Sequence, residues 1–228
     1  MEDRLIEGQI SYYRARAPEY EEWFLRQGRH DLGHELNRRW RSELDHIRES
    51  LADFGPAGEV LELACGTGLW TVELARYADG ITAVDASPEA LEINRRKLED
   101  APVRYVRANL FDWRPDDAYD AVFFGFWLSH VPPERFVAFW ELVRSSLKPG
   151  GRVFFVDSLR PGTSEEENRS VSAPGDHTVL RQLNDGSEFR IVKVFYDPRL
   201  LEDRLGDLGW NVRVHTTENL LYGLGERR

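Results

Sequence analysis

The sequence predicts an α/β fold with a doubly wound, mostly parallel sheet, and two features carry this prediction. The apolar run 59–63 (EVLEL) leads into a turn that contains Gly66 and Gly68, and a helical segment follows. A second apolar run, 81–85 (ITAVD), ends in Asp85 about 20 residues after this turn. Strand, glycine turn, helix and second strand form the opening half of a nucleotide-binding βαβ unit.

The glycine turn predicts a binding site built largely from backbone. Glycine lets a ligand approach the chain where a Cβ would clash, and the first N–H groups of the following helix are unpaired. Asp85 can accept hydrogen bonds from both hydroxyls of a ribose. Two ligand classes fit, a dinucleotide such as NAD and S-adenosylmethionine. The dinucleotide fingerprint needs a third glycine, and Thr71 stands where that glycine is expected, which disfavours NAD.

Four segments, in this order and spacing, resemble the class I (Rossmann-type) S-adenosylmethionine-dependent methyltransferases that act on small molecules. The segments are 62–68 (ELACGTG), 84–88 (VDASP), 119–124 (YDAVFF) and 147–155 (LKPGGRVFF). The resemblance implies a seven-stranded sheet with an antiparallel last strand, and S-adenosylmethionine as the cofactor. Two positions depart from the family pattern: the family often has Gly where Ala64 stands, and often has Asp where Asn109 stands.

The same resemblance implies which residues contact the cofactor. Asn109 and the backbone of Leu110 take the place where the family contacts adenine, with Asp112 as the alternative partner. Tyr13 and Tyr20 lie in a segment similar to one that many small-molecule methyltransferases fold over the cofactor; packing against the sheet is the alternative. The predicted cofactor-binding residues are Tyr13, Tyr20, Glu62, Ala64, Gly66, Thr67, Gly68, Asp85, Ala86, Asn109, Leu110 and Phe126.

The remaining elements follow from local signals along one predicted domain of 228 residues. Residues 1–54 combine charges and aromatic side chains with a helical stripe over 36–51, which predicts an N-terminal helical cap before the cofactor-binding core of 55–158. The other predicted strands are 103–107, 121–124, 152–157, 210–217 and 219–223. Four further helices are predicted. The first crossover helix has the apolar stripe Trp70, Leu74 and Tyr77, and the others run from Pro88 to about Glu99, from 133 to an end at 148–151, and from Pro198 to about Leu208.

An inserted β-hairpin is predicted before the last helix. Residues 178–183 and 188–195 alternate in polarity around the turn sequence NDGS. Residues 159–177 are polar and without a period, and we interpret them as part of a substrate lid. Lid loop and hairpin together occupy 159–196, and the last helix with two strands occupies 197–228.

Composition excludes several function classes. The net charge of −10 argues against binding nucleic acid, since that affinity depends on Lys and Arg neutralising phosphates. No apolar run reaches the ~18 residues that span a bilayer, and the N-terminus lacks the plan of a signal peptide. Cys65 is the only cysteine, so an internal disulfide is impossible. We expect a cytoplasmic protein, monomer or homodimer, that binds neither nucleic acid nor membranes.

We expect the reaction to take place at the edge of the sheet just after strand 121–124. Phe126 and Trp127 would surround the reacting groups there, with Trp127 against the acceptor. His130 is the candidate base and a second acceptor contact, because histidine titrates near neutral pH; capping the next helix is its alternative role. A metal-assisted reaction would need a carboxylate-rich site at the edge of the sheet, and only Asp157, at the end of strand 152–157, stands there. We therefore expect no metal requirement.

The predicted reaction is methyl transfer from S-adenosylmethionine to a nucleophilic oxygen, nitrogen or sulfur atom of a small, partly apolar molecule. The motifs of enzymes that methylate DNA bases are absent from the sequence. Two alternatives stay open: a non-catalytic module that binds S-adenosylmethionine for regulation, and a methyltransferase that acts on a protein.

Overall fold

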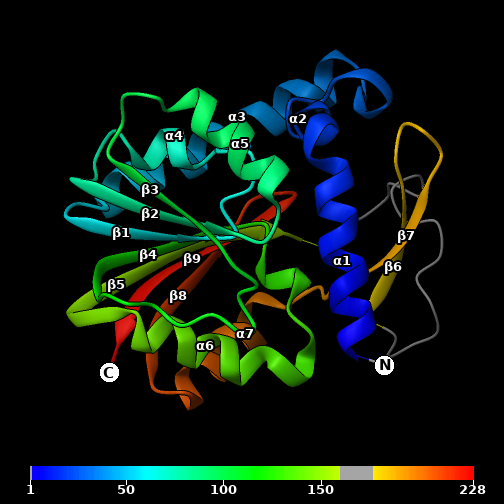
Figure 1. The fold of residues 1–228 in the computed structure, drawn as a ribbon. Helices are drawn as coiled ribbons and strands as arrows, with labels where there is room; N and C mark the ends of the chain where they lie inside the picture. Colours follow the sequence, from blue (N-terminus) through cyan, green and yellow to red (C-terminus); the bar gives the residue numbers. More distant parts are fainter. Residues whose placement is uncertain (1, 160–176) are drawn as a thin grey trace.

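The computed structural model describes residues 2–159 and 177–228. They form a seven-stranded sheet with helices on both faces and a separate hairpin (Figure 1). The strands of the large sheet are β1 (Glu59–Leu63), β2 (Gly80–Asp85), β3 (Val103–Arg107), β4 (Tyr119–Gly125), β5 (Leu147–Ser158), β8 (Trp210–Thr216) and β9 (Leu220–Arg227).

The strand order is β3-β2-β1-β4-β5-β9-β8. Strands β1 to β5 pair in parallel, and β9 lies antiparallel between β5 and β8. The predicted doubly wound sheet with an antiparallel last strand is confirmed. The order reverses between β1 and β4, and open α/β sheets bind ligands at the carboxyl ends of strands beside such a switch point.

Helices cover the two faces of this sheet (Figure 1). On one face lie α3 (His34–Phe54), α4 (Thr71–Leu74) and α5 (Pro88–Lys97), and on the other lie α6 (Phe136–Ser145) and α7 (Pro198–Asp207). Strand β4 is buried on both sides because its side chains alternate between two cores. Val122 and Phe124 pack with α6 and α7, while Ala121 and Phe123 pack with α3.

The N-terminal cap and the hairpin meet at the carboxyl edge of the sheet. Helix α1 (Glu2–Arg16) runs past this edge, and the hairpin of β6 (Thr178–Gln182) and β7 (Glu188–Val192) lies on its outer side (Figure 1). A short helix, α2 (Tyr20–Phe24), continues the cap. Both predicted additions to the fold are confirmed. The predicted lid of 159–177 lies, except for its two ends, outside the described residues.

Three local expectations differ from the structure. Helix α4 has only four residues, so Tyr77 falls beyond it and is 37% exposed instead of joining an apolar stripe. The predicted helix from 133 begins as a 3-10 turn, Pro133–Arg135, and α6 follows it. The segment 147–151 (LKPGG) opens β5 instead of ending that helix, because Leu147 pairs with Tyr119 before a register shift.

Two predicted helix starts are confirmed in detail. Ser87 Oγ accepts a hydrogen bond from Ala90 N at 3.1 Å, and Asp197 Oδ1 accepts from Arg199 N at 2.9 Å. Both caps precede a proline in the first turn, where a missing N–H costs nothing. Across the described ranges, no helix combines the length and the apolarity needed to cross a membrane.

Candidate cofactor and acceptor site

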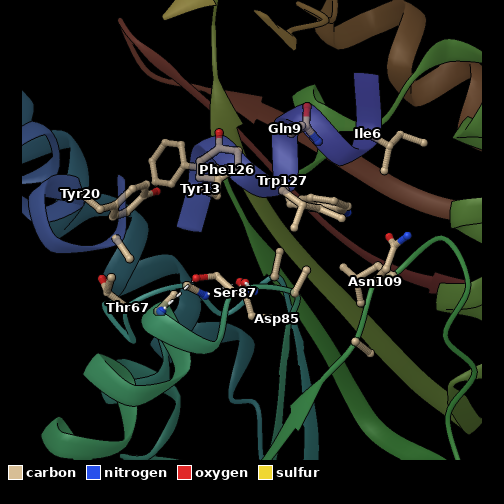
Figure 2. Close-up of a pocket in the computed structure, with 18 of the residues that line it drawn as sticks. Ile6, Gln9, Tyr13, Tyr20, Thr67, Asp85, Ser87, Asn109, Phe126 and Trp127 are labelled. Carbon is tan, nitrogen blue, oxygen red and sulfur yellow. Dashed lines mark hydrogen bonds between the residues drawn. The ribbon is translucent and has the colours of Figure 1, made fainter. Parts of the chain in front are cut away.

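A pocket lies where β1, β2 and β4 end. The turn after β1, the end of β2 and the loop after β3 form one wall, and α1 with the start of α2 forms the opposite wall (Figure 2). The residues that the cap contributes are Ile6, Gln9, Ile10, Tyr13, Ala17 and Tyr20.

Backbone geometry shapes the sheet side of the pocket. Ala64 (φ 55°) and Phe126 (φ 54°) follow the ends of β1 and β4, and both hold a left-handed conformation that costs a non-glycine residue about 1–3 kcal/mol. Gly66 (φ 53°) repeats this conformation in the turn without that cost. All three line the pocket. These turns redirect the chain at the switch point, so backbone faces the cavity.

Asp85 ties the end of β2 to the glycine turn. Its Oδ2 accepts a hydrogen bond from Gly66 N at 2.9 Å, and its Oδ1 accepts from Ser87 N at 2.8 Å. Burial raises the pKa of Asp85, and these backbone donors act against that rise. The carboxylate also lines the pocket, where its remaining lone pairs can accept the hydroxyls of a ribose.

Two orphaned polar atoms lie below the turn, in a smaller cavity that adjoins the pocket at Tyr20. Glu62 Oε2 and Thr67 Oγ1 are buried without a hydrogen-bond partner. Burial raises the pKa of Glu62 to about 8. A carboxyl with one unsatisfied oxygen beside a binding pocket fits the ammonium group of the amino acid portion of S-adenosylmethionine, which would supply the missing partner.

Gly68 has a packing role that the motif alone does not reveal. It lines neither cavity, and a Cβ at this position would lie 2.5 Å from Asn94 Oδ1 in α5. Its φ of +89° also favours glycine. The turn and α5 therefore approach each other through Gly68, and Lys97 Nζ holds them together by donating to Thr67 O at 2.7 Å.

The far end of the pocket is formed by Asn109, Leu110 and Phe111. Asn109 uses its side chain to build this loop: Oδ1 accepts from Phe111 N at 3.2 Å and Nδ2 donates to Asp112 Oδ2 at 2.7 Å. Asp112 does not line the pocket. Any adenine contact here would thus use Asn109 and backbone, with Asp112 bracing the amide from outside.

His130 reaches the pocket through Tyr13. Its Nδ1 lies 2.7 Å from Val192 O and its Nε2 lies 2.7 Å from the Tyr13 hydroxyl. A carbonyl only accepts, so Nδ1 carries the proton; the ring is neutral because burial and neighbouring cations hold the pKa of His130 well below its usual range. Tyr13 therefore donates to Nε2, and its oxygen keeps lone pairs for a further partner. Tyr13 lines the pocket and His130 does not.

Gln9 fixes this pair in place. Its Nε2 donates to His130 O at 3.1 Å, and its Oε1 accepts from Val192 N at 3.1 Å. One buried amide thus joins α1, the loop after β4 and the hairpin. The depth of Tyr13 raises the pKa of its phenol well above the usual value, so the hydroxyl keeps its proton.

Most predicted site residues line this pocket, and the exceptions are Gly68, His130 and Glu62, which lines the smaller cavity. Sequence reasoning missed much of α1. The lining positions of the cap recur every three or four residues, as on one helix face. Gln9 and Tyr13 interrupt the apolar character of that face, so no hydrophobic period was visible. Ser87, Ala90, Ala108, Phe111 and Gly125 complete the lining.

No group of three or more His, Cys, Asp or Glu side chains that could hold a metal ion is present within 2–159 and 177–228. Cys65 is buried, and burial raises the pKa of its thiol. Neither observation bears on the predicted metal independence, which stays a prediction.

Comparison with known proteins places this pocket in context. A family model described as a methyltransferase domain matches residues 60–151. The solved complex of DhpI with SAH is 42% identical, with a TM-score of 0.82 over 98% of this chain and 97% of that chain. The DhpI complex with SAM and HEP is 43% identical, with a TM-score of 0.81 and 96% coverage of both chains.

Two curated relatives match shorter stretches. Demethylmenaquinone methyltransferase of Clavibacter sepedonicus is 40% identical over 108 residues, which are 46% of this chain and 43% of the relative. Cypemycin N-terminal methyltransferase of Streptomyces sp is 32% identical over 145 residues, 60% of this chain and 58% of the relative. The chain thus spans about half the length of the curated relatives it matches.

The likeness to DhpI extends over nearly the whole chain, including the cap that closes the pocket and the hairpin that packs on α1. The cofactor is S-adenosylmethionine, as in the complexes of that protein. The chain belongs to the class I S-adenosylmethionine-dependent methyltransferases.

Proposed function

We propose that this protein transfers the methyl group of S-adenosylmethionine to an oxygen or nitrogen atom of a small, partly apolar molecule, without a metal. The observation that carries the proposal is the pairing of Tyr13 with neutral His130 at the pocket wall opposite Asp85. It puts a polar atom of fixed orientation beside the aromatic side chains of Phe126 and Trp127. The bound cofactor supplies a methyl group already activated by a sulfonium charge.

The protein itself then has to orient the two reactants and to exclude water from them. Asp85 and the turn at Gly66 hold a ribose, while Phe126, Trp127 and the α1 side chains screen the reacting atoms. Holding two reactants in a productive geometry is worth roughly 7–11 kcal/mol of the barrier. Aromatic faces add about 0.5–2 kcal/mol of attraction for a positive charge.

Tyr13 and His130 give a route for the acceptor's proton. Since Tyr13 donates to His130 Nε2, its oxygen accepts from an O–H or N–H of the acceptor. As the acceptor atom forms its bond to the methyl carbon, its proton passes to the Tyr13 oxygen and the phenolic proton passes to Nε2. His130 thus keeps its predicted role as a base, but it takes the proton through Tyr13 and does not contact the acceptor itself.

A donor-consumption assay tests the proposal. The purified chain with S-adenosylmethionine is offered phenols, carboxylic acids, amines, thiols, HEP, a reduced quinone and a peptide with a free N-terminus. The last three follow the names of the relatives. Steady production of S-adenosylhomocysteine with a small acceptor supports the proposal. Turnover with the peptide alone favours a protein substrate, and binding of the cofactor without turnover on any member favours the regulatory module.

A further inference from the structure

Arg16, the last residue of α1, is a partly buried cation held by aromatic rings instead of a carboxylate. Its guanidinium carbon lies 5.4, 5.3 and 5.7 Å from the ring centres of Tyr12, Tyr20 and Trp23. Its Nη1 donates to the Tyr12 hydroxyl. In the part of the chain that the structure describes, no acidic side chain forms an ion pair with Arg16, whereas Arg14 on the same helix pairs with Glu89 at 2.8 Å.

This arrangement leaves the guanidinium incompletely satisfied. Removing a charge from water is costly, and the cation–π attraction of the aromatic rings offsets only part of that cost. Five N–H donors form a planar fork that matches an oxyanion, and the Tyr12 hydroxyl takes one side of it. The chain has a net charge of −10 and therefore many carboxylates. Among the described residues, none of these carboxylates forms an ion pair with Arg16.

Arg16 also lies beside the pocket. Gln9 and Arg16 are seven residues apart, so both project from the same side of α1, and Gln9, Ala17 and Tyr20 line the cavity. Tyr20 lies at the end near Thr67, opposite the Asn109 end (Figure 2). That end also adjoins the cavity of Glu62, so a zwitterionic group would find an anion partner and a cation partner together.

We propose that Arg16 binds an oxyanion that a ligand brings into the pocket. The two sources of that chemistry are the carboxylate of the amino acid portion of S-adenosylmethionine and an acidic group of the acceptor. This inference rests on the proposed function but assigns a residue that neither the motifs nor the pocket lining identifies.

Calorimetry on the full chain distinguishes the two sources. Wild type, Arg16→Gln, Arg16→Lys and the control Arg14→Gln are titrated with S-adenosylhomocysteine and with its decarboxylated analogue, which keeps the amine. Each variant saturated with S-adenosylhomocysteine is then titrated with inorganic phosphate and with acetate. Arg14→Gln removes a cation of the same helix that pairs outside the pocket. Arg16→Lys keeps the charge should the glutamine variant fold poorly, and thermal melts of the free proteins check folding.

If Arg16 holds the cofactor carboxylate, Arg16→Gln raises the Kd of S-adenosylhomocysteine by about 30-fold or more. The same variant raises the Kd of the decarboxylated analogue by less than about threefold. If it holds an acid of the acceptor, both cofactor affinities stay unchanged, and the loaded wild type binds phosphate or acetate while loaded Arg16→Gln does not. The lysine variant falls between wild type and glutamine, and the Arg14 control matches wild type.

Unchanged binding of S-adenosylhomocysteine together with no Arg16-dependent binding of either anion overturns the inference. That result leaves the proposed function standing. Failure of the wild type to bind S-adenosylhomocysteine at all would instead reject the proposed function.

Discussion

Glu62 brings a titratable carboxyl into the protein interior beside the pocket. Its pKa of about 8 exceeds the ~4.3 of an unfolded chain, so the folded state holds more protons between those values and loses stability as pH rises through them. Glu62→Gln should therefore raise the melting temperature of the cofactor-free protein at pH 8 by at least about 3 °C, and change it little at pH 5. Thermal denaturation at both pH values checks this; an equal shift at both would refute the titration argument.

The raised pKa of Glu62 also predicts that this carboxyl releases a proton when the cofactor binds. An ammonium group near Glu62 favours the ionised form, so binding at pH 7 should expel up to about one proton. Calorimetry with S-adenosylhomocysteine in two buffers of different ionisation enthalpy measures that number. Glu62→Gln should abolish the release, whereas undiminished release in this variant would assign it to another group.

Tyr13 and His130 should behave as one unit in catalysis. Tyr13→Phe is expected to lower kcat by about 100-fold with little change in KM for the cofactor, because the acceptor loses its hydrogen-bond partner. His130→Ala should lower kcat too, and the double variant should cost no more than Tyr13→Phe alone. Tyr222→Phe removes a hydroxyl that contacts His46 Nε2 at 3.2 Å outside the pocket, and it is the matched control.

The low pKa of His130 sets the pH dependence of this unit. A neutral ring persists below the usual histidine value, so kcat should not fall between pH 7 and pH 6 through His130. A loss centred near 6.5 that disappears in His130→Ala would contradict this, as would additive effects in the double variant.

Among the elements, the turn between β1 and α4 depends on close packing against α5. Gly68→Ala would place a Cβ against Asn94, whose side chain also donates to Thr71 Oγ1 at 2.8 Å and accepts from Tyr105 at 3.0 Å. We expect a loss of about 2 kcal/mol or more in unfolding free energy, measured by urea denaturation. Gly186 has a similar φ of +87°, and a Cβ added there would meet no atom within 4 Å, so Gly186→Ala should cost distinctly less. Equal costs would mean that backbone conformation alone matters.

Helix α1 is the element that turns a cofactor cradle into an enclosed site. It closes the pocket with one face and packs on β7 with another. Buried or part-buried polar contacts hold it there: Gln9 bonds to the loop after β4 and to β7, and Tyr13 bonds to His130 in that same loop. These partners belong to two elements that are far from α1 in the sequence, so the position of the helix follows from the assembled fold.

For the whole molecule, selective ligand stabilisation is the broadest prediction. A ligand that binds only the folded chain at 100 times its Kd adds about 2.7 kcal/mol, which raises the melting temperature by roughly 5–10 °C for a chain of this size. S-adenosylhomocysteine should give this shift, and NAD at the same concentration should give none. Thermal melts with both ligands suffice. A shift with NAD alone would overturn the cofactor assignment.

Local signals determined the fold class, the order of the core elements and the cofactor motif. The run before the glycine turn, the second strand with Asp85, and the caps at Ser87 and Asp197 all act over a few residues, so their geometry is encoded where they stand. Asp85 meets Gly66 only 19 residues away through a single βαβ step. A motif with so short a path can be interpreted without the rest of the chain.

Only the tertiary structure decided which groups share the acceptor end of the pocket. Tyr13 and His130 are separated by 117 residues, and Gln9 and Val192 by 183. No periodicity links such pairs, because their contact depends on α1, the loop after β4 and the hairpin all docking at one sheet edge. The same docking places Arg16 among aromatic rings. The sequence does not show which charged side chains will lack an acidic neighbour in the folded chain.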